Sequence, residues 1–148
     1  MLNVNTRSAS MRAYIVEDTQ RIEPALTIIA IVIPPTPGEI DPTAPPSGTG
    51  CAECLAAGGW WLHLRRCATC GHIGCCDSSP SQHASHHATE AGHPMIRSFE
   101  PGEDWFYSYV TEQFYEGPEL APPEHHPLDQ PTPGPAGRVP PDWQRHIH

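Results

Sequence analysis

The sequence predicts a small α+β domain with a short antiparallel sheet and one helix, held together by bound metal and flanked by Pro-rich tails. Of the 19 prolines in the 148 residues, 15 fall in residues 34–50 and 117–148. The fixed φ and missing N–H of proline exclude those stretches from helix and sheet interiors. The intervening residues 51–116 are too few for a secure hydrophobic core alone. They contain all six cysteines and six of the ten histidines, which indicates metal as the stabilising element.

These boundaries divide the chain into three parts. We expect residues 1–50 to be a largely disordered N-terminal extension and Pro-rich linker, and residues 117–148 to be a disordered Pro/His-rich tail. Two apolar patches in the extension, residues 13–16 and 26–33, are candidate strands. The folded domain is then residues 51–116.

Within the domain, apolar and aromatic runs predict strands at residues 60–64, 95–99 and 105–110. One helix is predicted over residues 80–91, with Ser79 as N-cap and Gly92 as the stop. This helix has almost no large apolar side chain, so an ordinary hydrophobic face cannot hold it against the domain.

Two thiol pairs, Cys51-x-x-Cys54 and Cys67-x-x-Cys70, are the strongest chemical signal. Such a turn places both sulfurs on one side of a tight loop, as tetrahedral zinc requires. The remaining candidate ligands are Cys75, His83, His87 and His93, which give eight donors in total. Eight donors suffice for two closed four-ligand zinc sites, and closed sites are structural rather than catalytic.

Other readings of the cysteines fit less well. A thioredoxin-like redox pair belongs at a helix start in a βαβ context, which neither pair has. A disulfide framework would need a secreted chain and would leave the interleaved histidines unexplained.

The charge of the chain argues against binding to nucleic acid. The formal net charge is −9, and the chain has eight arginines and no lysine. No basic stripe is available to follow a phosphate backbone, so we expect no nucleic-acid partner. The longest apolar run, residues 26–33, is far below the roughly 20 residues that span a bilayer, so we expect no membrane partner and a cytoplasmic location.

The order and spacing of the ligands resemble the ubiquitin-specific-protease type zinc finger (ZnF-UBP) in its short bacterial form. The resemblance rests on Cys51-Ala-Glu-Cys54, Cys67-Ala-Thr-Cys70-Gly-His-Ile-Gly-Cys75, His83-Ala-Ser-His-His87 and Gly92-His93-Pro94. It implies two zinc ions. The implied ligands of the first are Cys51, Cys54, Cys75 and His83, and those of the second are Cys67, Cys70, His87 and His93.

The resemblance also implies a peptide-binding groove. Trp105 and Tyr107 fall where the family places aromatic residues around a pocket for the ubiquitin C-terminus. Asp77 stands where ubiquitin binders have an arginine, so we expect ubiquitin itself not to bind. A replacement cation could come from Arg65, Arg66 or Arg97.

These features favour a non-enzymatic, monomeric zinc-binding interaction module whose partner is a peptide or protein terminus. No nucleophile–base pair lies outside the zinc ligands, and a hydrolase would need an open metal site. The alternative is a thiol redox or metal-sensing protein that uses the thiol pairs and Cys76. In the leading reading Cys76 is a spare thiol and His86 only a neighbour of the ligands.

Overall fold

The computed structural model describes residues 39–120 and 125–148, so the candidate strands at residues 13–16 and 26–33 lie outside it. The described elements, in chain order, are α3 (Ala52–Ala57), β1 (Leu64–Cys67), β2 (Ile73–Cys75), α4 (His83–Ala91), β3 (Met95–Ser98), β4 (Phe106–Ser108), β5 (Gln113–Tyr115) and the 3₁₀ helix η3 (Trp143–Arg145). None of the helices among these residues has the length and apolar character needed to cross a bilayer.

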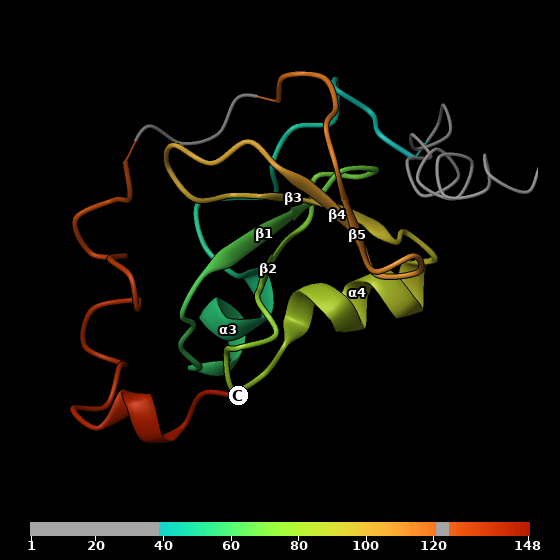
Figure 1. Cartoon of the computed structure of the whole chain (residues 1–148). Helices are drawn as coiled ribbons and strands as arrows, with labels where there is room; N and C mark the ends of the chain where they lie inside the picture. Colours follow the sequence, from blue (N-terminus) through green and yellow to red (C-terminus); the bar gives the residue numbers. More distant parts are fainter. Residues whose placement is uncertain (1–38, 121–124) are drawn as a thin grey trace, which may run out of the picture. The chain divides into compact units, whose positions relative to one another are not determined.

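The strands form one sheet in the order β2-β1-β3-β4-β5, with every neighbouring pair antiparallel. Both α3 and α4 contact β2, and they lie below the sheet in the view of Figure 1. The predicted class, a small α+β domain with an antiparallel sheet and one main helix, is confirmed.

Individual strands differ from the prediction. Those expected at residues 95–99 and 105–110 contain β3 and β4, whereas the one expected at 60–64 is wrong except for its last residue. Trp61, in that segment, is fully buried and forms an isolated bridge with Gly134 instead. Strands β2 and β5 have three residues each, too few for a recognisable alternation.

Helix α4 begins at His83, three residues later than predicted. Ser79 is not its N-cap, because the Ser79 hydroxyl accepts a hydrogen bond from the Leu62 amide over 2.9 Å. The residue before the helix is Gln82, in the left-handed conformation with φ of 55°. The predicted stop is confirmed, since Gly92 ends the helix with φ of 70°.

The core surrounds the cysteines. One cluster of buried side chains combines three of them with Trp61, Leu64, Ile73 and Phe99. A second consists of Ala68, Met95, Phe106 and Leu120. Helix α4 approaches β2 so closely that a Cβ on Gly74 would lie 2.7 Å from the Ala84 amide nitrogen, so only glycine fits there.

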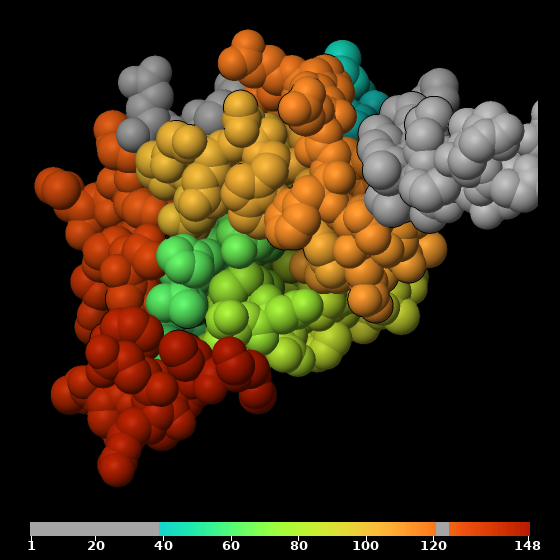
Figure 2. Space-filling model, in the orientation of Figure 1, coloured from blue at the N-terminus to red at the C-terminus, as the bar shows by residue number. Residues whose placement is uncertain are grey.

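The described parts of both flanks pack on the domain, which differs from the expected disorder. The Asp41 amide donates to the Ala68 carbonyl over 2.8 Å, and the Trp61 amide donates to that of Gly134 over the same distance. In Figure 2 the C-terminal segment, drawn in red, lies against the green part of the domain. Proline excludes regular elements, but the non-proline residues between still supply backbone donors and acceptors.

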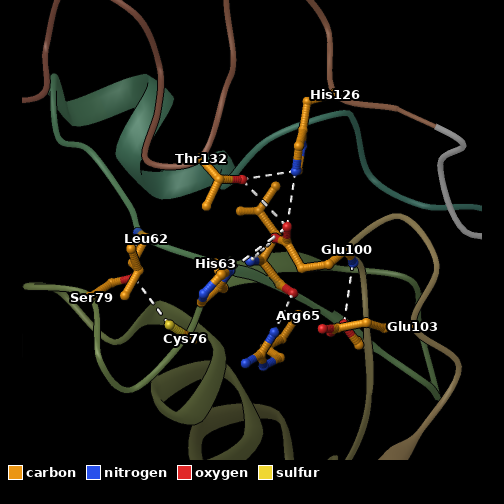
Figure 3. Close-up of polar contacts among 11 residues, drawn as sticks. Leu62, His63, Arg65, Cys76, Ser79, Glu100, Glu103, His126 and Thr132 are labelled. Carbon is orange, nitrogen blue, oxygen red and sulfur yellow. Dashed lines mark hydrogen bonds and ion pairs between the residues drawn. The ribbon is translucent and has the colours of Figure 1, made fainter.

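A buried carboxylate joins the C-terminal segment to the sheet (Figure 3). Glu100 is only 7% exposed; its Oε2 accepts the Leu64 amide over 2.7 Å. Its Oε1 lies 2.9 Å from His126 Nε2 and 3.7 Å from His63 Nδ1. Thr132 Oγ1 lies 2.9 Å from the same His126 nitrogen. In a hydrolytic triad the carboxylate and the hydroxyl contact different nitrogens of the histidine ring. Here Glu100 and Thr132 both contact His126 Nε2, so the group is a structural contact and not a triad.

Candidate metal sites and aromatic pocket

The first donor cluster brings together Cys51, Cys54, Cys75 and His83, whose ligand atoms all lie within 4.8 Å of one another. The three sulfurs are 3.3, 3.4 and 3.5 Å from His83 Nδ1, and the Cys54 and Cys75 sulfurs are 3.9 Å apart. Tetrahedral zinc, with Zn–S bonds of about 2.3 Å and Zn–N bonds of about 2.0 Å, separates its sulfurs by about 3.8 Å and sulfur from nitrogen by about 3.5 Å. The donors therefore fit a zinc ion without rearrangement.

Local backbone geometry sets these donors in place. Cys51 is the N-cap of α3, and its sulfur accepts a hydrogen bond from the Cys54 amide over 3.4 Å. The sulfur of Cys75, at the end of β2, accepts from the His83 amide over 3.2 Å. The helix α3 was not predicted, because its six residues are too few for a periodic pattern.

The three thiols of the first cluster strongly shift one another's pKa. Hydrogen bonds with Cys51 and Cys75, together with burial, raise the pKa of Cys54. Hydrogen bonds from Cys51 and Cys54 lower the pKa of Cys75 to about 2. Three thiolates this close together repel one another, and a divalent cation bound among them would offset that repulsion.

The second cluster consists of Cys67, Cys70, His87 and His93. The Cys67 sulfur is 3.6 Å from His93 Nδ1, and the Cys70 sulfur is 3.3 Å from His87 Nε2. These separations also match a tetrahedral zinc. Burial raises the pKa of Cys67. Cys70 is exposed, whereas all three cysteines of the first cluster are buried, so the second cluster is the more accessible to solvent.

One carboxylate connects the two clusters. Glu53 Oε2 lies 2.7 Å from His72 Nε2, and its other oxygen accepts from the Cys51 thiol over 3.8 Å. The His72 ring stacks on His87 with 4.1 Å between centroids and 7° between planes. Sequence reasoning missed this arrangement, because the residues come from three separate segments.

The remaining histidine and cysteine candidates lie outside both clusters. His86 is exposed on the surface of α4. Cys76 is buried, with its sulfur 3.4 Å from the Ser79 hydroxyl.

A pocket of about 200 Å³ opens where β1, β3, β4 and β5 meet the loop after β2. Four of its nine lining residues are aromatic. The lining residues are Arg65, Cys76, Asp77, Ser78, Ile96, Trp105, Tyr107, Tyr109 and Phe114.

The pocket contains the three side chains expected in the groove, Asp77, Trp105 and Tyr107. Of the candidate cations only Arg65 lies in it, with its guanidinium carbon 4.8 Å from the Trp105 ring centroid. Arg66 and Arg97 are buried and hydrogen-bond to backbone carbonyls elsewhere.

Two aromatic walls were missed by sequence reasoning. The alternation of Trp105, Tyr107 and Tyr109 in one segment was a signal for Tyr109. Phe114 had no such signal, because it reaches the pocket through the pairing of Tyr107 with Phe114 across β4 and β5.

Comparison with known proteins agrees with this architecture. Residues 51–120 match the Zn-finger in ubiquitin-hydrolases and other proteins. The solution NMR structure of protein RPA1320 from Rhodopseudomonas palustris is 45% identical, with 58% of this chain and 84% of that chain covered and a TM-score of 0.52. Comparison with curated proteins found no match. The resemblance to ZnF-UBP is thus confirmed, and the chain belongs to the family of zinc fingers found in ubiquitin-hydrolases and other proteins.

Proposed function

We propose that this chain is a non-enzymatic interaction module whose domain is stabilised by two structural zinc ions and whose aromatic pocket binds a peptide or protein terminus. The sulfur–nitrogen separations of 3.3 to 3.5 Å in the first cluster carry the metal assignment. Cys51, Cys54, Cys75 and His83 would hold one ion, and Cys67, Cys70, His87 and His93 the other. When bound, each ion would supply a cross-link and charge compensation for its thiolates.

A binding role is favoured over catalysis by the separation of the two features. Each metal cluster offers four protein donors, which fill a tetrahedral coordination sphere and leave no position for a reacting water. The pocket is lined by side chains of neither cluster and presents aromatic rings, which are frequent in protein-binding surfaces.

The metal part is tested by counting zinc and free thiols in protein purified anaerobically under reducing conditions. We expect two zinc ions per chain by elemental analysis and one thiol, that of Cys76, that is not bound to zinc. Because Cys76 is buried, its thiol should react only after denaturation, together with the thiols that are then released from the metal. The rival reading, a thiol redox or metal sensor, is favoured by the exposure of Cys70. It predicts fewer than two zinc ions and disulfides that form readily in air.

The binding part is tested separately by NMR of the zinc-loaded full chain with a library of short peptides that vary in both termini and in charge. We expect chemical-shift changes at the Trp105 indole and at the Tyr107 and Phe114 amides, and loss of the amide changes in Trp105→Ala. Trp143→Ala, in η3, is the matched control and should leave them unchanged. A library without any such response contradicts the proposal.

A further inference from the structure

The aromatic pocket has a feature that the binding of a peptide terminus does not by itself explain. Its rings form a continuous series, with Tyr109 edge-to-face on Tyr107 at 5.6 Å, Tyr107 on Phe114 at 5.1 Å, and Phe114 on Trp105 at 5.3 Å. Phe114 is 66% exposed despite its size. A large aromatic side chain left in solvent next to a hollow indicates a surface that is covered by a ligand.

A carboxylate without a cationic partner among the described residues lies beside these rings. Asp77 is exposed, and no hydrogen bond or ion pair joins its carboxylate to another residue of 39–120 or 125–148. Burial raises the pKa of Tyr107, and the carboxylates of Glu112 and Asp77 raise it further. Burial and Asp77 likewise raise the pKa of Tyr109. Both hydroxyls are therefore protonated at neutral pH, and the Asp77 carboxylate acts on both rings.

The one cation in the pocket is already engaged. Arg65 lies over the Trp105 ring, and its Nη1 donates to the Leu64 carbonyl over 3.0 Å. Its position shows that the Trp105 ring attracts a cation. Among the described residues no cation lies over Tyr107, Tyr109 or Phe114.

From this arrangement we infer that the pocket binds a cationic side chain, of the lysine or arginine class, presented by a flexible peptide. The cation would contact the Tyr107 and Phe114 rings and pair with the Asp77 carboxylate. A volume of about 200 Å³ suits one long side chain, since small-molecule sites typically measure about 300–1,000 Å³. The net charge of −9 supports the approach of a basic partner. This inference rests on the proposed peptide-binding function and specifies the chemistry of the partner.

The test is calorimetry on the zinc-loaded full chain with three blocked pentapeptides that differ only at the central residue: lysine, trimethyllysine and norleucine. Norleucine keeps the alkyl chain of lysine and removes the charge. We expect the norleucine peptide to bind at least about tenfold more weakly than the two cationic peptides. A fourth peptide, with a free C-terminal carboxylate and no basic residue, tests the opposite charge preference.

Variants locate the binding. Asp77→Asn should weaken the lysine peptide by about tenfold, whereas Asp142→Asn, the same charge change at a residue that does not line the pocket, should leave it unchanged. Phe114→Ala, at an exposed position, should weaken it without affecting the fold. Equal binding of the norleucine peptide, tighter binding of the carboxylate peptide, or equal effects of the two aspartate variants would overturn the inference. A carboxylate preference leaves the proposed peptide binding intact, whereas no binding by any peptide contradicts both.

Discussion

Arg138 Nη1 donates a hydrogen bond to the carbonyl oxygen of Cys54 over 2.9 Å, although 84 residues separate the two in sequence. The same guanidinium lies 3.4 Å from the Leu55 carbonyl and 3.3 Å from that of Gly59. These carbonyls belong to α3 and the turn that ends it, and a positive charge is favourable at the C-terminal end of a helix. The C-terminal segment is thereby attached to the helix that carries the first thiol pair.

Replacing this arginine should loosen the segment without unfolding the domain. Because Arg138 is exposed, we expect Arg138→Ala to lower the free energy of unfolding by only about 1 kcal/mol. Hydrogen exchange at the Gly134 amide, which donates to the Trp61 carbonyl over 3.0 Å, should become faster. Arg145→Ala, in η3, is the control and should change neither quantity. Unaltered exchange in Arg138→Ala would show that the contact does not hold the segment.

Removal of zinc should unfold the domain. Structural zinc supplies on the order of 10 to 16 kcal/mol in small domains at neutral pH, more than the net stability of a typical domain. We expect chelation to abolish the cooperative thermal transition measured by circular dichroism, and added zinc to restore it. Acidification should act in the same direction, because protons compete for thiolates and imidazoles. A near-native spectrum and melting temperature after complete chelation would contradict the proposal.

The histidines of α4 should differ sharply in effect. His83→Ala should reduce the zinc content from two ions to one, and His87→Ala should do the same through the second cluster. His86→Ala is the matched control on the same helix, and its exposed ring should be dispensable for both ions. Elemental analysis of the three purified variants measures the outcome. Loss of zinc in His86→Ala with retention in His83→Ala would mean that the donor sets are misassigned.

Glu100 should remain ionised below the pH at which a glutamate ordinarily protonates. Burial opposes its charge, but the His63 ring, the Leu64 amide and the charge of His126 outweigh burial and lower its pKa below 4.5. The contribution of its ionisation to stability is therefore present above pH 4.5 and is lost as the pH falls through the lower folded-state value. Carbon NMR of the side-chain carboxyl, followed down to the pH of unfolding, should show it more than half ionised at pH 4.5.

A matched variant tests whether the ionised Glu100 carboxylate stabilises the folded protein. Glu100→Gln keeps the shape but removes the charge, so it should destabilise the folded protein at neutral pH and show a smaller loss on acidification below 4.5 than the unmodified chain. A Glu100 midpoint at or above pH 4.5 would contradict the prediction.

Free ubiquitin should not bind specifically. Asp77 repels the C-terminal carboxylate where ubiquitin binders of the resembling family carry an arginine, and Arg65 is engaged with Trp105. A missing charge-assisted hydrogen bond of about 1.5 to 3 kcal/mol corresponds to roughly 10- to 150-fold in affinity before the repulsion is added. Calorimetry with ubiquitin should detect no specific binding. A micromolar dissociation constant that disappears when the two terminal glycines of ubiquitin are deleted would refute this.

Placing an arginine at position 77, as in the ubiquitin binders, tests the same explanation from the other side. Asp77→Arg should gain affinity for carboxylate-terminated peptides and lose it for the lysine peptide. Loss of both would indicate that the substitution has closed the pocket.

The sequence alone determined the chemistry of the metal sites and the approximate place of the main helix. Cysteine and histidine donors at short spacings report ligand chemistry directly, because each thiol pair lies within one turn of backbone. Gly92 likewise marks the end of α4 through a local conformational requirement. The start of that helix was misplaced because the Ser79 hydroxyl, a plausible cap in sequence, bonds to Leu62 in the folded chain.

Only the tertiary structure decided how distant segments meet. Spacing leaves several ways to divide eight donors between two sites, and the fold brings Cys75 to His83 and Cys70 to His87. Phe114 joins the pocket through strand register, and Glu100 reaches His126 across a chain segment with no periodic pattern. Such contacts depend on which polar groups and rings find partners once the chain is compact, and that information lies in the packing rather than in any local run of residues.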